Sequence, residues 1–538
     1  MPHSDETGNY PHNALTRRDL VKGATGLVAA GALGSMLEPL GGTALGAQTG
    51  ISSAVAPRRG GTLALALTDT EASETLDPAT AAVSTQFVLG GLLFNTLLTA
   101  DSSDWSLHPS LAESWEANHN FTRYQFKLRR GVHFHNGAPL TSADVVWSIA
   151  RQLDPKVKSA AAVRAKMSLS PGSAKASGPD TVIVNLTRPD SQLPYLLARP
   201  FLAIVPHGQT AFTPATTVGT GPFKLDAWQA ATSWKVSRNP HYWESGLPYL
   251  DGIDMVVNAE SAARLEGVVT GQFDLVEEVD YSSAKASLSN GSIRVLPFAK
   301  GISRVIVMDC SVKPFSDPNV RLAFKLAMNR QLAVNAVYSG FAVPTSDLPL
   351  PPTDPYYPPG LGVRAYDPQR AKHLLAKAGY ASGIDVEMFT STVVSAMPEL
   401  AVTYAQTAAA AGIRVKTTQW APATYWDQVW LVKPLYTTYW ETPYPPDYLW
   451  YVYGANATYN EAKLKLPQVA QAYDSIMRTG DKARQIQLTQ TVYRLLADVW
   501  GHIIPGDTKS PWVSTPRVYG VTGDQPATRV QLTRAFKR

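Results

Sequence analysis

The sequence predicts an α/β fold in more than one lobe, because strand-like and helix-like segments alternate along the chain after residue 60. The first strand is expected at Gly60–Leu67, where a short apolar run follows two glycines. Tyr124–Leu128 and Ile413–Thr417 alternate between apolar and polar residues, which is typical of strands with one buried face. The segments between these strands carry helix signals.

Apolar runs with start and stop signals predict those helices. Phe87–Leu98 is apolar over more than two helical turns and is expected to be a core helix. Thr141 precedes Asp144 by three positions, a capping-box spacing that predicts a helix through Ile149. Met397–Ala411 is rich in alanine and is followed by a glycine, which predicts another helix.

Two further helices are expected to begin at Asp-Pro pairs, because proline is favoured at the first helical position. Asp317–Pro318 opens a segment that Gly340 closes, and Asp367–Pro368 opens one that Gly379 caps. Between them, Pro344–Pro359 has the composition of an exposed, extended connection.

Composition indicates a packed globular protein. The chain has 538 residues, of which 45% are hydrophobic and 17% charged, so disorder, collagen and a coiled-coil rod are excluded. The formal charge of +5 is too small for this length to indicate a nucleic-acid or membrane-surface partner. Cys310 is the single cysteine, which excludes an intramolecular disulfide and a cysteine-based zinc site. With no cysteine near the N-terminus, we expect no lipid anchor.

The N-terminal segment has the pattern of an export signal. Thr16–Lys22 contains paired arginines, and the small, apolar run Gly23–Leu37 that follows is too short to span a bilayer. An N-terminal buried helix is the alternative interpretation. The pattern predicts that the mature protein is soluble and periplasmic, with a cleavage site between residues 41 and 56 that the sequence leaves open.

Common catalytic motifs are missing from the sequence: there is no Gly-x-Ser-x-Gly elbow, His-Glu-x-x-His motif, Walker A loop or EF-hand loop. Gly219–Pro222 lacks the third glycine of a dinucleotide fingerprint and is expected to be a structural turn. His133 and His135 could lie on one face of a strand as half of a metal site, but no third ligand is nearby. We therefore expect no metal and no cofactor.

Tryptophan and tyrosine are concentrated between Trp420 and Tyr459, where acidic residues are few. Because both side chains combine an aromatic body with a polar tip, they are favoured on binding surfaces. A wall that contacts a ligand and ordinary core packing both remain open interpretations of this segment. A wall would suit sugar faces, aromatic side chains or cationic groups.

Several segments match, in order, the patterns of one known family. These are Leu111–Glu116, Tyr124–Val146, Val218–Leu225, Arg238–Trp243, Asp317–Arg330 and Tyr366–Lys372. The sequence thereby resembles, over essentially the whole mature chain, the extracellular solute-binding proteins of family 5, the peptide, opine and nickel receptors of ABC importers.

The resemblance implies a two-lobed periplasmic-binding-protein fold of the large class, with an extra subdomain in the first lobe and the ligand at the hinge between lobes. Residues 1–56 would be the twin-arginine signal peptide and leader. The core of the first lobe would comprise residues 57–81, 216–300 and 506–538, its extra subdomain residues 82–215, and the second lobe residues 301–505.

The resemblance also suggests ligand-contacting residues in the second lobe. In peptide-binding members, the segment equivalent to residues 439–447 carries an aromatic residue followed by an Asp that pairs with the peptide amine. Trp440 matches the aromatic residue, but the spacing here differs, so Glu441, Asp447 or neither takes the role of that Asp. Tyr439 and Tyr444 flank these positions. Residues 390–397 lack the basic residue that reads a dipeptide carboxylate, which disfavours a simple dipeptide.

Ser84, Thr85 and Gln86 lie where family members often contact the ligand from the other lobe, and ordinary loop polar residues are the alternative.

The function expected from the resemblance is capture of a peptide-like or amino-acid-derived solute and its delivery to an ABC permease in the inner membrane. An oligosaccharide or other neutral organic solute is the alternative ligand, and a secreted hydrolase that uses Glu441 and Asp447 is a third possibility. The expected partners are the solute, the permease and the twin-arginine export machinery, with no nucleic acid, and the protein is expected to be a monomer.

Overall fold

The computed structural model describes residues 55–68, 74–101, 103–298, 302–440, 444–524 and 529–538, and its mixed sheets with flanking helices confirm the predicted α/β class. A seven-stranded sheet contains the predicted first strand, which is parallel to both of its neighbours. Leu63, Leu65 and Leu67 are fully buried on one face of this strand, as a period of two requires. In spatial order the strands are β12 (Arg294–Phe298), β20 (Ser510–Ser514), β11 (Leu275–Val276), β1 (Thr62–Leu67), β10 (Gly252–Val257), β9 (Ser233–Arg238) and β8 (Phe223–Gln229).

A four-stranded antiparallel sheet lies in the segment between β1 and β8. Its strands, in spatial order, are β4 (Ala112–Ala117), β5 (Arg123–Leu128), β7 (Thr181–Asn185) and β6 (Ala174–Ala176). The helices of this segment are η2 (Pro78–Thr80), α2 (Ser84–Leu93), α3 (Ser142–Arg151), α4 (Ala162–Ala165), α5 (Leu193–Leu197) and η3 (Pro200–Leu202). The capping box predicted for α3 is present, because Asp144 Oδ2 accepts the backbone N–H of Thr141 at 2.7 Å. We call the region of the seven- and four-stranded sheets the first lobe.

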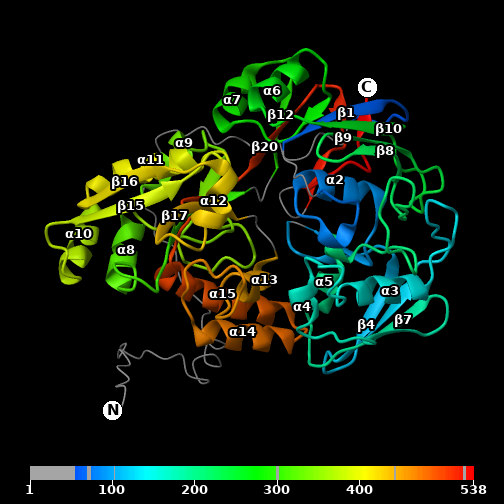
Figure 1. Ribbon diagram of the computed structural model, residues 1–538, viewed down its shortest axis with the longest axis horizontal. Helices are drawn as coiled ribbons and strands as arrows, with labels where there is room; N and C mark the ends of the chain where they lie inside the picture. The colour runs from blue at the N-terminus through cyan, green and yellow to red at the C-terminus, as the bar shows by residue number, and fades with distance from the viewer. Residues whose placement is uncertain (1–54, 69–73, 102, 299–301, 441–443, 525–528) are drawn as a thin grey trace, which may run out of the picture. The chain divides into compact units, whose positions relative to one another are not determined.

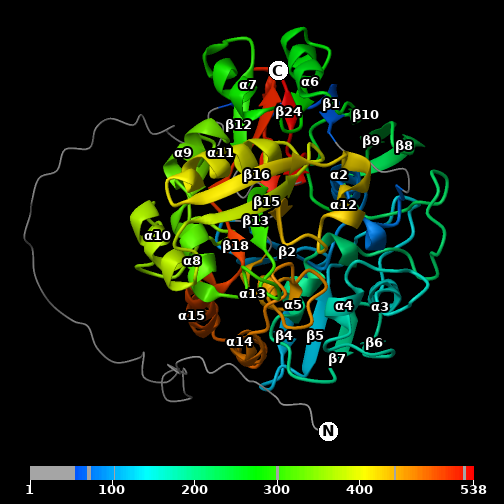
Figure 2. The same cartoon turned by 60° about the vertical axis from the view of Figure 1, so that its left-hand side comes forward.

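The second lobe is built on a five-stranded sheet. Its strands, in spatial order, are β16 (Ile413–Gln419), β15 (Ile384–Thr390), β17 (Leu435–Trp440), β13 (Ser303–Met308) and β18 (His502–Ile503). Its helices are α8 (Pro318–Leu326), α9 (Arg330–Ala336), α10 (Pro368–Lys377), α11 (Met397–Ala409), α12 (Pro422–Gln428), α13 (Pro445–Tyr451), α14 (Pro467–Met477) and α15 (Lys482–Val499). Figures 1 and 2 show α14 and α15 side by side at one edge of this lobe, next to the four-stranded region of the first lobe.

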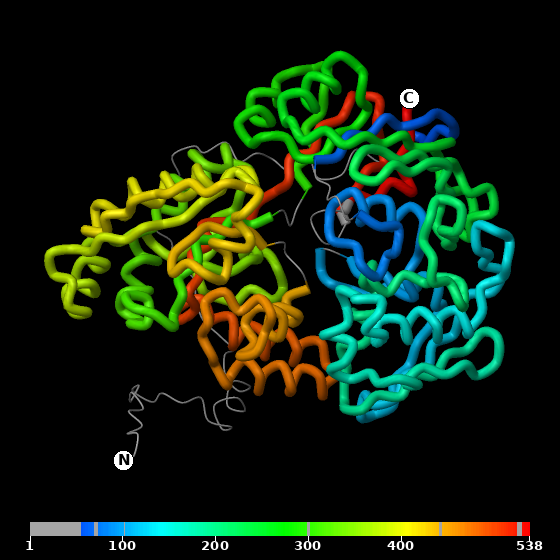
Figure 3. The backbone as a smooth tube through the Cα atoms, viewed as in Figure 1, coloured from blue at the N-terminus to red at the C-terminus, as the bar shows by residue number. Residues whose placement is uncertain are grey.

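Small elements complete the two lobes. They are β2 (Leu98–Ala100), β3 (Leu107–Pro109), α6 (Ser261–Val269), α7 (Tyr281–Ala286), η4 (Ser287–Ser289), β14 (Ala342–Pro344), β19 (Gly506–Thr508), β21 (Val518–Tyr519), β22 (Thr522–Asp524), β23 (Arg529–Gln531) and β24 (Phe536–Lys537). The chain passes from β18 and β19 of the second lobe into β20 of the first, as the red segment of Figure 3 shows. The residue boundaries of the lobe segments expected above stay a prediction.

The helix predicted at Phe87–Leu98 has other bounds in the structure, since α2 runs from Ser84 to Leu93 and Leu98 begins β2. The carbonyl of Leu93 accepts the N–H of Gly221 at 2.9 Å instead of continuing the helix. A Cβ atom at Gly219 would lie 1.9 Å from that carbonyl oxygen, so only glycine allows this approach. The Gly219–Pro222 segment is therefore the structural turn that the sequence predicted.

The single helix predicted from Asp317 to Gly340 is two helices. Helix α8 ends at Leu326, and Asn329 caps α9 by accepting the N–H of Leu332 at 3.0 Å. The guanidinium of Arg330 donates to the carbonyls of residues 325 and 328, which supplies partners for groups freed by the break.

The prediction that Pro344–Pro359 is exposed is wrong, because residues 345–350 are all buried. The side chain of Asp347 in this segment has no exposed surface, and its carboxylate binds the guanidinium groups of Arg330 and Arg364 at 2.5 and 3.0 Å. A buried carboxylate requires such partners, and they draw the proline-rich segment into the second lobe.

The predicted export signal, Thr16–Lys22 with Gly23–Leu37, lies outside the described residues. Among the residues that the structure describes, no helix combines the length and the apolar character that crossing a membrane requires.

Candidate functional site

Tyr444, immediately before α13, joins the second lobe to the first. Its ring stacks on Tyr195 of α5 with centroids 3.9 Å apart and planes inclined by 11°. Its hydroxyl donates to Gln192 Oε1 at 2.9 Å and lies 3.0 Å from the hydroxyl of Tyr356. Because each phenol has one proton, Tyr356 donates to Tyr444 in this arrangement. The side chain of Tyr444 is thus fixed by both lobes.

A buried cation lies against the same rings. Lys482, the first residue of α15, donates to the Tyr195 hydroxyl at 2.6 Å. Its ammonium is 4.8 Å from the ring of Tyr195, 5.1 Å from that of Tyr356 and 5.2 Å from that of Tyr444. Burial disfavours the charged form and lowers the pKa of Lys482 to about 8. We call these four residues the Lys482 cage.

Two further contacts cross between the lobes beside the cage. The indole of Trp105, which has no exposed surface, donates to Asp354 Oδ2 at 3.1 Å. Asp447 of α13 forms an ion pair with Arg199 and accepts the indole N–H of Trp450 at 3.0 Å. Asp447, predicted as a partner for a ligand amine, therefore already has a cation of the first lobe as its partner.

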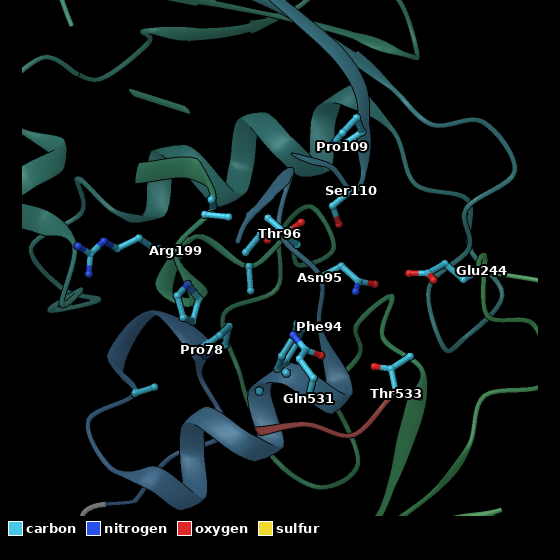
Figure 4. A pocket seen from close by; sticks show the side chains of 18 of the residues that line it. Pro78, Phe94, Asn95, Thr96, Pro109, Ser110, Arg199, Glu244, Gln531 and Thr533 are labelled. Carbon is cyan, nitrogen blue, oxygen red and sulfur yellow. The ribbon is translucent and has the colours of Figure 1, made fainter. Parts of the chain in front are cut away.

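A cavity of about 320 Å³ opens next to these contacts. Figure 4 shows residues that line it, among them Asn95, Ser110, Arg199 and Glu244. The lining comes from α2, the β2–β3 region, the end of α5 with η3, residues 242–244 and the C-terminal strands, all of the first lobe. Among the lining residues that the structure describes, Tyr444 alone belongs to the second lobe.

The charged groups of the cavity wall neutralise one another. Arg534 donates to Glu244 Oε2 at 3.1 Å, and Arg199 is paired with Asp447. Asn95 Oδ1 accepts the indole N–H of Trp243 at 3.0 Å, which fixes the amide. The lining that the structure describes therefore presents hydroxyls, amides and aromatic edges without an unpaired charge.

Of the predicted first-lobe residues, only Gln86 lines this cavity. Ser84, Thr85 and Gln86 form the first turn of α2, and all three are buried. Ser84 binds Glu277 and Thr85 binds Glu74. These bonds hold neighbouring loops of the first lobe in place, so ligand contact by Ser84, Thr85 and Gln86 stays a prediction.

Gln86 also caps its own helix, because its Oε1 accepts the N–H of Ala82 at 2.8 Å and that of Val83 at 3.2 Å.

The aromatic segment of the second lobe contains both core residues and partly exposed rings, and contact of the exposed rings with a ligand stays a prediction. Tyr425, Tyr436, Tyr448 and Tyr453 are at most 1% exposed and belong to the core. Other rings remain partly exposed and form one connected set of contacts, in which the centroids of neighbouring rings are 4.6 to 6.0 Å apart. This set, which we call the aromatic surface, comprises Trp426, Trp430, Tyr439, Trp440, Tyr451 and Tyr459. It lies at the end of β17, and the predicted Glu441 that follows lies outside the described residues.

Glu461, which no sequence pattern singled out, lies beneath the aromatic surface. Its side chain is fully buried. Oε1 accepts the indole N–H of Trp430 at 2.5 Å, and Oε2 accepts that of Trp440 at 2.7 Å. A single acid after an aromatic segment is not a recognisable pattern, so the sequence alone could not have indicated it.

His135 and Cys310 have structural surroundings. His135 Nδ1 accepts the N–H of Gly219 at 3.3 Å, and Nε2 donates to the carbonyl of Gly221 at 3.1 Å. Burial lowers the pKa of His135 to about 4, so the ring is neutral and both nitrogens are occupied. Cys310 is buried, and burial raises the pKa of its thiol to about 11.

Two α/β lobes that meet over a cavity define the class of two-lobed solute-binding proteins. Within this class, the chain belongs to the bacterial extracellular solute-binding proteins of family 5, because residues 106–460 match the model of that family's middle region. The glutathione-binding protein GsiB of Escherichia coli strain K12 is 29% identical over 354 residues, which cover 64% of this chain and 67% of GsiB.

Solved structures confirm the predicted fold. The periplasmic binding protein DppA from Helicobacter pylori, in complex with the peptide STSA, has a TM-score of 0.75 at 23% identity over 89% of this chain and 98% of that one. The ABC transporter substrate-binding protein CtaP from Listeria monocytogenes has a TM-score of 0.78 at 17% identity over 89% of this chain and 100% of that one.

Proposed function

We propose that this protein is the solute receptor of an ABC importer and that it encloses a peptide-like or amino-acid-derived solute between its lobes. A solute that touches both lobes stabilises the closed arrangement, which a membrane permease can recognise. The observation that carries the proposal is Tyr444, which brings the second lobe to a cavity otherwise lined by the first. The solute leaves the receptor chemically unchanged.

Relatives support a peptide-like ligand. GsiB is named for glutathione, a tripeptide, and the solved DppA complex contains a peptide. In our proposal Trp440, Tyr439 and Tyr444 contact the solute from the second lobe and Gln86 from the first. Glu441 remains the candidate acid for an amine, because Asp447 is paired with Arg199.

A neutral solute such as an oligosaccharide is the second candidate, and the wall of the cavity favours it. The charged side chains in the described lining are paired with one another or with Asp447. Aromatic faces of the kind found on the aromatic surface pack against sugar rings. Hydrolysis by Glu441 and Asp447 is less well supported, since the Asp447 carboxylate is buried and is already bound by Arg199 and Trp450.

The proposed setting is the periplasm. Export by the twin-arginine machinery through residues 16–37, release without a lipid anchor, and action as a monomer with an inner-membrane permease form part of the proposal. Family membership supports a place outside the cytoplasm.

A thermal-shift panel tests the function. The leaderless protein, stripped of any co-purified solute by unfolding and refolding, is heated with glutathione, other peptides, their N-acetylated forms, amino-acid derivatives and sugars. A solute at 100 times its Kd stabilises the protein by about 2.7 kcal/mol. Shifts with free-amine peptides but not acetylated ones support the peptide receptor. Shifts with sugars alone favour the second candidate, and chemical turnover of any solute contradicts the receptor role.

A further inference from the structure

Glu461 lies where two tryptophans of the aromatic surface converge. It follows Tyr459 in the loop between α13 and α14, and its carboxylate has no exposed surface. Each oxygen accepts one indole N–H, Oε1 from Trp430 and Oε2 from Trp440. The two tryptophans come from different elements, since Trp430 follows α12 and Trp440 ends β17.

This pairing requires a carboxylate. An indole N–H can only donate, and an ionised carboxylate can only accept, so both oxygens of Glu461 match their partners. A glutamine at this position would offer one oxygen and one NH₂ group, and the NH₂ would face an indole donor. Hydrogen bonds to an ionised acceptor are also stronger than neutral ones, especially where water is excluded.

The bonds determine how the exposed rings lie. With its N–H held, Trp440 packs edge-on against Tyr451 and Tyr459 at centroid distances of 5.9 and 5.7 Å. Trp430 contacts the same Tyr459 at 5.8 Å. One buried carboxylate thus orients both indoles around a shared tyrosine.

The carboxylate also lies close to a buried histidine. His502 of β18 is buried, and its Nε2 lies 3.2 Å from Glu461 Oε2. Strand β18 pairs with β13, which pairs with β17, the strand that ends at Trp440. Trp440 and His502, which lie on either side of Glu461, therefore belong to one sheet.

We propose that Glu461 is a positioning residue for solute binding, which holds the indoles of Trp430 and Trp440 in the orientation that a bound solute contacts. This inference rests on the proposed function for the identity of the solute, but the orientation of the two rings can be measured without any solute.

The first measurement is the nuclear magnetic resonance spectrum of the 15N-labelled indole groups in the leaderless protein, which has 13 tryptophans. Trp430→Phe and Trp440→Phe assign the two signals. In Glu461→Gln, at least one of these signals moves upfield and exchanges faster with solvent. The control is Asp309→Asn, which neutralises another buried carboxylate of the second lobe, one that binds Lys463 and no indole. The control leaves both signals in place.

The second measurement is affinity for a solute that the thermal-shift panel identifies. Affinity falls about tenfold in Glu461→Gln, which corresponds to roughly 1.4 kcal/mol. Trp440→Phe keeps an aromatic ring but cannot donate to Glu461, and its affinity falls similarly. If Glu461→Gln does not fold, the affinity of Trp440→Phe still tests the proposal.

Unmoved indole signals in Glu461→Gln, equal movement in Asp309→Asn, or full affinity in Trp440→Phe and Glu461→Gln overturns the proposal. If no solute in the panel binds the wild type, the proposed function fails, and the indole signals alone decide whether Glu461 orients the rings.

Discussion

Two aromatic clusters of this protein surround buried charges of opposite sign. In the Lys482 cage, tyrosine rings and one hydroxyl surround an ammonium group. Around Glu461, indole N–H groups surround a carboxylate. The choice of ring follows the charge, because a tyrosine oxygen can accept from a cation, whereas an indole N–H can only donate to an anion.

The clusters also differ in where their members come from. Tyr195 of the cage belongs to the first lobe and the other members belong to the second, whereas every partner of Glu461 belongs to the second lobe. A charge whose partners lie in its own lobe keeps those partners when the lobes move apart. A cation between lobes is only partly compensated, as the lowered pKa of Lys482 indicates. A contact of this kind suits lobes that must separate.

Tyr444→Ala has the largest expected effect, because it removes the ring that joins the two lobes in the Lys482 cage. Removing a buried ring that stacks across the lobes is expected to lower the free energy of unfolding by about 3 to 5 kcal/mol. Because the contact crosses the lobes, amide hydrogen exchange should increase in residues 191–199 of the first lobe, measured by mass spectrometry.

Tyr448→Ala is the matched control, since Tyr448 lies one turn further along α13 and its ring packs against Trp440 and Tyr453 of the second lobe. A similar loss of stability without faster exchange in residues 191–199 is expected. Equal exchange in the two variants would show that Tyr444 does not join the lobes.

Trp440→Ala tests the other cluster. We expect solute affinity to fall by about 1 to 3 kcal/mol while the fold remains intact, as for buried aromatic anchors at binding sites. Isothermal titration with a solute from the panel measures the change. Trp420→Ala, a tryptophan of the same lobe outside the aromatic surface, should bind as the wild type does. Unchanged affinity in Trp440→Ala would remove the aromatic surface from the site.

Lys482→Met has the smallest expected effect on the free energy of unfolding, and that effect depends on pH. The pKa of Lys482 is about 8 in the folded protein and 10.5 ordinarily, so below pH 8 the folded state bears the full penalty of a desolvated charge. Between these values the folded state releases its proton first, and the wild type gains stability as the pH rises. We expect the variant to be more stable by about 1 kcal/mol at pH 7. Urea unfolding should show that the difference in free energy of unfolding between the variant and the wild type shrinks towards pH 10.5.

Local signals in the sequence predicted the helices that have their own caps. Asp367 binds the N–H of Arg370 at 2.9 Å, and α10 begins at Pro368 as expected. Errors arose where a distant residue decides the outcome. Helix α2 ends because Gly221 takes the carbonyl of Leu93, and residues 345–350 are buried around the ion pairs of Asp347. Neither partner can be recognised from neighbouring sequence.

The residues of the candidate site were also predicted where the local sequence carries a signal and missed where distant residues decide. The density of tryptophan and tyrosine indicated the aromatic segment, and the family resemblance indicated Trp440, with Tyr439 and Tyr444 beside it. Lys482 and Glu461 were missed, because a single lysine at a helix start and a single glutamate in a loop carry no pattern. Their roles arise from tertiary packing, which places aromatic rings from several elements around each charge.

Cys310 has a practical consequence for observing the lobes. Its thiol is buried and, with a pKa of about 11, carries little of the reactive thiolate at neutral pH. It is the single cysteine in the sequence, so maleimide dyes should leave the native protein unlabelled and react only with cysteines introduced on the surface. A donor and acceptor fluorophore, one on each lobe, can then report solute-driven motion by energy transfer without removal of any native residue.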